Sequence, residues 1–167
     1  QSTDQNIWSD ISGATSQNYT PSGFLEGTYY IRRKLTVSRT NPGSIVVSAI
    51  DYSNIATLTV RPVFAAGTIA NTGQTICSGT VPTTQIGSTA DAGGGDNTIT
   101  YKWQYSTDNT FSTGVSTVAS NTATYIPTQA LTQTTYYRRQ AKDGTCNTMF
   151  TSSSGVWSVT VNPLPTA

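Results

Sequence analysis

The feature that most constrains this chain is an internal repeat whose period is close to the size of a whole domain. Residues 19–33 read YTPSGFLEGTYYIRR, residues 125–139 read YIPTQALTQTTYYRR, and the two segments align without a gap. Shorter matches flank them, with STD at 2–4 and 106–108, and LTV at 58–60 against VTV at 159–161. A period of about 100 residues indicates tandem domains, because solenoid repeats are much shorter.

The two copies differ in completeness. Residues from about 65 to 105 have no counterpart earlier in the chain. We therefore predict that residues 1–61 are the C-terminal half of a repeat and that 62–66 are a linker. Residues 67–163 form a complete repeat, and 164–167 begin a further linker, where the Asn-Pro-Leu-Pro run favours extended backbone.

Composition favours an all-β protein without catalytic chemistry. Charged residues make up 10% of the chain, and the formal net charge is +1, so nothing indicates nucleic-acid binding. Histidine is absent, which removes the commonest general base and metal ligand, and we expect no enzyme activity and no cofactor. No apolar stretch approaches the length of a membrane span, so we expect no membrane insertion.

Short β-prone runs separated by Gly, Pro, Asn and Asp predict about seven strands in the complete repeat. In the clearest run, apolar side chains from Ile99 to Tyr105 alternate with polar ones. A tryptophan in the middle of this run favours an immunoglobulin-like β-sandwich, complete in the second repeat and present as a C-terminal half in the first. The predicted core residues are Trp103, Tyr137, Val159 and Val161.

The first repeat has its own predicted inward face. Ile31 stands where the second repeat has Tyr137, and a position that accepts either residue is expected to be buried. Leu35 and Val37 follow on the same face of that strand. Four strands with such a stripe cannot close a sandwich alone, so we expect completion either by a longer array or by strands from a neighbouring chain.

Several runs together resemble a known repeat type. They are GTIANTGQTICSGTVPT, ITYKWQYSTD, TYIPTQALTQTTYYRR, GTC and VTVNPLP. The chain is similar to the Ig-like tandem repeats of giant Bacteroidetes cell-surface adhesins, including gliding-motility adhesins exported by type IX secretion. The resemblance implies a secreted cell-surface protein with a structural or adhesive role. The first repeat departs from the pattern because it lacks the cysteine expected after its Arg-Arg strand.

The two cysteines both fall in the complete repeat. Cys77 precedes the tryptophan strand and Cys146 follows the Arg-Arg strand. Two thiols without histidine do not complete a zinc site, and no Cys-x-x-Cys spacing is present for a redox couple. We therefore predict a Cys77–Cys146 disulfide, which would indicate an oxidising, extracellular compartment.

Two polar groups are candidates for ligand contacts. Arg138 and Arg139, with Tyr136, recur in the first repeat, and they could bind an anion or could pack their stems on the sheet, which recurrence favours. Asp91 and Asp96 bracket three glycines, and we weigh a calcium loop against a plain turn, which is the stronger interpretation.

Three functions remain open at this stage. The first is a structural or adhesive segment of an extracellular adhesin or filament, with neighbouring repeats or identical subunits as partners. The second is a carbohydrate-binding module that contacts surface polysaccharide by aromatic stacking, with four candidate side chains: Trp8, Tyr29, Tyr52 and Phe111. The third is a fibre subunit completed by strands from a neighbouring chain.

Overall fold

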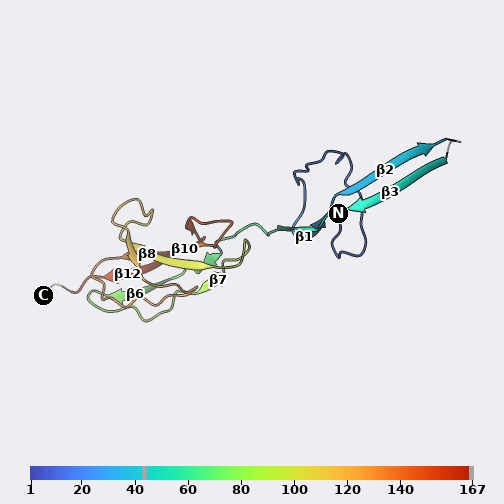
Figure 1. The fold of residues 1–167 in the computed structure, drawn as a ribbon. Coiled ribbons are helices and arrows are strands. Elements are labelled where there is room, and N and C mark those ends of the chain that lie inside the picture. Colours follow the sequence, from blue (N-terminus) through green and yellow to red (C-terminus); the bar gives the residue numbers. More distant parts are fainter. Residues whose placement is uncertain (43–44, 166–167) are drawn as a thin grey trace. The chain divides into compact units, whose positions relative to one another are not determined.

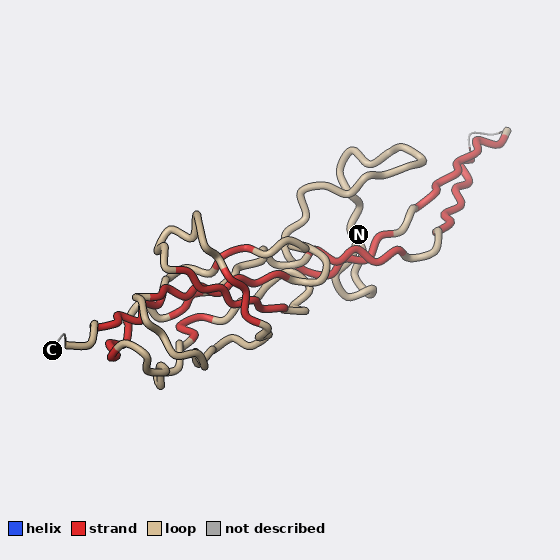
Figure 2. The backbone as a smooth tube through the Cα atoms, turned by 90° about the vertical axis from the view of Figure 1, so that its left-hand side faces the viewer, coloured by secondary structure: helices blue, strands red, loops and turns tan. Residues whose placement is uncertain are grey.

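The computed structural model describes residues 1–42 and 45–165, and it divides the chain into two compact units, Gln1–Arg61 (unit 1) and Pro62–Ala167 (unit 2). The described residues form strands and loops only, so the protein is all-β, as predicted (Figure 2). No helix in this part of the chain could cross a membrane. Unit 1 contains β1 (Gly27–Ile31), β2 (Lys34–Asn41), β3 (Ile45–Tyr52) and β4 (Ala56–Val60).

Unit 2 is built on one six-stranded sheet with the strand order β6-β12-β10-β8-β9, and β11 is also paired to β10. Strands β6, β8, β10 and β12 of this sheet are labelled in Figure 1. The pair of β6 and β12 is parallel, and the other pairs are antiparallel. A small second sheet pairs β5 with β7. The strands are β5 (Thr68–Ile69), β6 (Gly73–Cys77), β7 (Ser88–Ala90), β8 (Thr100–Ser106), β9 (Ser116–Val118), β10 (Thr135–Lys142), β11 (Thr151–Ser152) and β12 (Trp157–Asn162).

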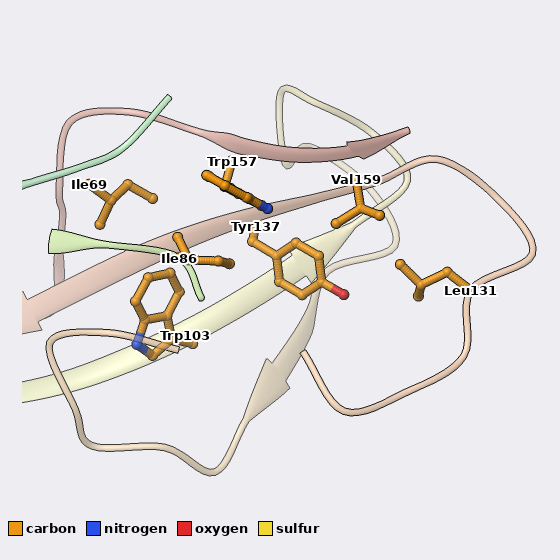
Figure 3. Close-up of a cluster of buried hydrophobic side chains, with 7 residues drawn as sticks. All are labelled: Ile69, Ile86, Trp103, Leu131, Tyr137, Trp157 and Val159. Atoms are coloured by element: carbon orange, nitrogen blue, oxygen red, sulfur yellow. The ribbon is translucent and has the colours of Figure 1, made fainter. Parts of the chain in front are cut away.

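The core of unit 2 lies on one face of the large sheet, where side chains from distant segments meet (Figure 3). Trp103 on β8 is fully buried and donates from its indole N–H to the Thr122 carbonyl at 2.8 Å. Tyr137 on β10 and Val159 on β12 are buried beside it, and Val161 packs half-buried against the same cluster. On β10, buried residues alternate strictly with half-buried ones, so Tyr137 points inward and Tyr136 outward.

Unit 1 consists of two separate strand pairs. Strand β1 pairs with β4, and the long hairpin β2–β3 pairs over its whole length. The predicted inward face is only partly covered, and Ile31 is half-buried. Leu35 and Val37 are 55% and 56% exposed, so their predicted burial is wrong. They lie on the hairpin, and no second layer of described residues packs against them.

The predicted Cys77–Cys146 disulfide is not formed, because both cysteines are exposed free thiols. Cys77 ends β6 and lies beside Asn162, beyond the end of β10 that starts at Thr135. Cys146 follows the opposite end of β10, after Lys142. A strand of this length spans roughly 20 Å, whereas the Cα atoms of a disulfide lie within about 7 Å. The separation of the two sheet ends therefore excludes this bridge in the folded unit.

Candidate functional site

The two units share one local framework around the Arg-Arg strand. In unit 2, Thr135 lies opposite Val159 and Tyr137 opposite Trp157. At the aligned positions of unit 1, Tyr29 lies opposite Leu58 and Ile31 opposite Ala56. Strand β1 therefore corresponds to the first part of β10, and β4 corresponds to β12.

The hairpin of unit 1 extends the same correspondence. In unit 2, β10 continues and pairs Gln140 with Ser152 of β11. In unit 1, Lys34, which aligns with Gln140, pairs with Tyr52. The loop that carries Cys146 in unit 2 is thus replaced in unit 1 by the longer β2–β3 hairpin, which explains why the expected cysteine is missing there.

A serine and an aspartate fix the turn that follows β8. Ser106 is buried, pairs with Tyr136 and accepts the N–H of Asp108 at 3.0 Å. The Asp108 carboxylate accepts hydrogen bonds from the side chain and backbone of Thr110 and from two further backbone N–H groups. Because these bonds favour the charged form, above all those from Thr110, they lower the pKa of Asp108 from 3.8 to about 2.

Unit 1 repeats this turn at its first residues. Ser2 is buried, forms a bridge with Tyr30 and accepts the N–H of Asp4 at 3.3 Å. The Asp4 carboxylate accepts the backbone N–H of Ile7 at 3.0 Å, which is the largest of the effects that lower its pKa. Ser2 therefore occupies the position of Ser106, the last residue of β8. The repeated STD run in the sequence was the signal for this turn, although its role could not be read from it.

Arg139 is the most heavily bonded side chain of unit 2. It is fully buried on β10, and burial lowers its pKa from the usual value. Its guanidinium donates to the Ser153 hydroxyl at 3.0 Å and to the Ser88 hydroxyl at 2.8 Å. It also donates to four backbone carbonyls, those of Ala66, Thr68, Ala90 and Ala123. The nearest carboxylate contact, to Asp91, is 3.9 Å long, and Asp91 is largely exposed.

These contacts define what Arg139 does. Five of its six acceptors belong to the segment before β5, to β5, to β7 and to the loop before residue 125, and the sixth, Ser153, follows β11. One side chain therefore connects β10 to all of these segments. All of its donor directions point into the protein, and this arrangement supports the structural interpretation of the arginine pair. Arg138, beside it, is half-buried, donates to Gln104 at 2.9 Å and lies over the Phe111 ring at 4.4 Å.

The equivalent arginine of unit 1, Arg33, is exposed. It retains one of the six contacts, since it donates to the Gln17 carbonyl at 3.5 Å and Gln17 aligns with Ala123. Arg32, which aligns with Arg138, stacks between the rings of Trp8 and Tyr52, with its Cζ atom 3.9 and 4.0 Å from their centroids. The first arginine of the pair, Arg32 or Arg138, thus contacts an aromatic ring in both units. The full set of acceptors around the second arginine is present only in unit 2.

The two aspartates of the glycine loop have different partners. Asp91 accepts the Ser88 hydroxyl, whereas Asp96 accepts the backbone N–H groups of Thr98 and Gly144. Among residues 1–42 and 45–165, no group of three or more His, Cys, Asp or Glu side chains is placed to hold a metal ion. Two of the three glycines have a packing role, because a Cβ atom at Gly95 would overlap the buried carboxylate of Asp143, and one at Gly94 would overlap the Val63 carbonyl.

The four aromatic side chains considered for sugar stacking do not form one platform. Phe111 is buried under Arg138, while Trp8 and Tyr52 hold Arg32 between them. Tyr29 makes an edge contact with Phe24, at 4.7 Å between ring centroids. A different aromatic site lies in unit 2, where a pocket of about 220 Å³ is lined partly by Tyr105, Tyr125 and Tyr137. Burial raises the pKa of the Tyr137 hydroxyl well above its usual value.

The comparison with family models gives one match, to a domain of unknown function, DUF8696, over residues 1–62 and 65–163. No curated protein and no solved structure matches the chain. The two matched ranges follow the two units of the structure closely. The chain belongs to the DUF8696 family and carries two regions that match it.

Proposed function

We propose that this chain is a non-enzymatic, load-bearing repeat segment of an extracellular surface adhesin or filament, built from Ig-like domains. The strand order β8-β10-β12, with a buried tryptophan on β8, supports the Ig-like part of this proposal, because the C, F and G strands of immunoglobulin domains have the same order and a buried tryptophan on strand C. The tandem arrangement of two related units supports an array, and the sequence resemblance supports a location at the cell surface.

The load-bearing role is supported by the parallel pairing of β6 with β12. These strands lie near the two ends of unit 2, and five residue pairs join them in register. A force applied through residues 62 and 163 would pull the start of β6 and the end of β12 in opposite directions along their common axis. The backbone hydrogen bonds between the two strands are then loaded together in shear. Together they withstand a higher force than hydrogen bonds that break one at a time.

Single-molecule stretching of the 167-residue chain tests this proposal. We expect unit 2 to unfold in one step that releases about 100 residues, roughly 30 nm of chain. Gradual lengthening at low force, without a step, would contradict a load-bearing role.

A matched pair of variants locates the resistance. A Cβ atom at Gly73 would lie 2.5 Å from the Ser158 carbonyl of β12, so Gly73→Ala should push β6 away and lower the unfolding force. A Cβ atom at Gly87 would lie in open space, so Gly87→Ala should leave the unfolding force unchanged. Equal forces in both variants would show that the β6–β12 pair does not carry the load.

The location is tested separately on intact cells that express the parent protein. Antibodies against unit 2 should label these cells without permeabilisation, and added protease should remove the label. Labelling that requires permeabilisation would overturn the surface assignment, whatever the mechanical result.

Carbohydrate binding is the second candidate, and the tyrosine-lined pocket of unit 2 favours it. Threonine and glutamine side chains, Thr117, Thr128 and Gln129, also line the pocket and could bind hydroxyl groups. Its volume of about 220 Å³ falls below the roughly 300–1,000 Å³ typical of small-molecule sites, so we rank it second. This candidate is tested by titrating the chain with soluble polysaccharides while tyrosine fluorescence is monitored. A fluorescence that does not change during the titration would eliminate carbohydrate binding.

A further inference from the structure

Two aspartates from distant segments of unit 2 each pack against the glycine that neighbours the other. A Cβ atom at Gly95 would overlap the Asp143 carboxylate, and one at Gly144 would lie 2.7 Å from Oδ2 of Asp96. The backbone N–H of Gly144 also donates to Oδ1 of Asp96 at 3.1 Å. The loop before β8 and the turn after β10 therefore bring two carboxylates together.

The Asp143 carboxylate is buried without a charged partner. The residue is 1% exposed, and its Oδ1 accepts the backbone N–H groups of Thr145 and Asn147 at 2.9 and 2.7 Å. Its Oδ2 is buried too and accepts no hydrogen bond from the described residues, and Asp143 forms no ion pair with any of their cationic groups. Such an oxygen is costly to bury, because burial removes the water that would stabilise its charge.

The groups at this point are oxygen donors of the kind that a calcium ion prefers. Oδ2 of Asp96 accepts the Thr145 hydroxyl, so two carboxylates and a hydroxyl meet where the loop and the turn join. Among the described residues no third His, Cys, Asp or Glu joins them, so the further ligands would be backbone carbonyls and water. Asp91, the other acidic residue of the loop, is directed instead to Ser88 and Arg139.

We propose that Asp96 and Asp143 bind a calcium ion between these two segments. The ion provides the positive partner that Oδ2 of Asp143 lacks, and it offsets the repulsion between the two carboxylates. This site differs from the pair weighed from the sequence, because Asp143 takes the place of Asp91. With two carboxylates, the affinity should resemble that of extracellular calcium modules, with a Kd on the order of 0.1–1 mM.

The glycine loop also holds the first residues of unit 2. The backbone N–H of Gly95 donates to the Pro62 carbonyl at 2.8 Å, and Gly93 exchanges two backbone hydrogen bonds with Ala65. Calcium bound at Asp96 therefore stabilises the segment through which force enters unit 2. This consequence rests on the proposed mechanical function, whereas the binding of the ion does not depend on it.

Thermal unfolding of the full 167-residue chain, with calcium chloride or with a chelator, tests the site. Tryptophan fluorescence reports on unit 2, because Trp103 and Trp157 are buried there. At about 10 mM calcium, at least roughly ten times the expected Kd, the unfolding temperature of unit 2 should rise by roughly 5 °C above its value with chelator. No rise with calcium, or an equal rise with sodium chloride of the same ionic strength, would overturn the inference. A stretching step that persists in the same protein would leave the proposed function intact.

Variants of the three aspartates assign the ligands. Asp143→Asn and Asp96→Asn each remove a carboxylate and should abolish the calcium-dependent rise, whereas Asp91→Asn should retain it. If Asp143→Asn does not fold, Asp96→Asn decides, since Asp96 is only half-buried. Calcium should also slow amide exchange at Gly93 and Gly95 in the parent chain and not in Asp96→Asn. A calcium response that survives Asp96→Asn, or that is lost in Asp91→Asn, would contradict the assignment.

Discussion

Arg139 is a buried cation whose close partners are all neutral oxygen atoms. Its six acceptors lie in segments that are otherwise joined by few bridges, and each would lose a charged donor if the guanidinium were removed. The side chain is therefore both a hydrogen-bond hub and a packing element of unit 2. Its sequence neighbour Arg138 makes contacts at the surface and carries no comparable role.

Replacing this arginine should strongly destabilise unit 2. We expect Arg139→Met to lower the free energy of unfolding by about 3 kcal/mol or more, because several buried acceptors lose their donors. The matched Arg33→Met variant should change stability by less than about 0.5 kcal/mol, since Arg33 is exposed. Denaturant unfolding monitored by tryptophan fluorescence measures the free energy of unfolding of both variants. Similar losses of stability in the two would show that the burial of Arg139 does not cause the destabilisation.

Asp108 makes the turn after β8 sensitive to acid. Its folded pKa of about 2 is lower than the unfolded value of 3.8, so the charged form stabilises the turn above pH 3.8. This contribution is lost as the pH falls through about 2. Titration of the Asp108 carboxyl by NMR should give a midpoint near 2, and Asp108→Asn should remove the pH dependence of the turn. A midpoint near 3.8 would mean that the hydrogen bonds of Thr110 are not formed.

At the scale of elements, the long strands of unit 2 could be predicted, and several of the short ones could not. Strands β8, β10 and β12 each have at least six residues, enough for alternation to appear in the sequence. Strands β7, β9 and β11 have two or three residues, too few for any period, and their pairing depends on tertiary contacts. In the segment 123–126, Tyr125 forms an isolated bridge with Ile86.

The predicted disulfide between the two cysteines is wrong, and the reason also lies in the arrangement of the strands. The sequence places Cys77 and Cys146 on either side of the core strands, but it does not say at which end of the sheet each one emerges. Because β6 runs parallel to β12, Cys77 lies at one end and the loop of Cys146 at the other.

The geometry of the sheet predicts two free thiols in the native chain. Titration of the folded protein purified without reductant should find two reactive thiols, since both side chains are exposed. Mild oxidation should then give disulfide-linked dimers instead of an internal bridge. A monomer without titratable thiols after oxidation would contradict the arrangement of β6, β10 and β12.

For the whole molecule, the repeat in the sequence predicts two related units, and the structure divides the chain at Arg61. The sequence could not show that unit 1 keeps the strand register of unit 2 around Tyr30, because register depends on which backbone groups face each other. Nor could it identify the acceptors of Arg139, which come from segments up to 73 residues away. Those contacts exist only once the N-terminal half of a repeat has folded over β10.

The two units differ in one respect on which the comparison between them depends: among the described residues, β10 of unit 2 is paired with β8 and β12, whereas β1 of unit 1 is paired with β4 and makes a single bridge on its other edge. Amide hydrogen exchange of the isolated 167-residue chain tests it most directly. We expect strong protection along β8, β10 and β12, where the strands are paired on both sides, and rapid exchange along β1 and β4 at the aligned positions. Equal protection of β1 and β10 in the chain alone would contradict it.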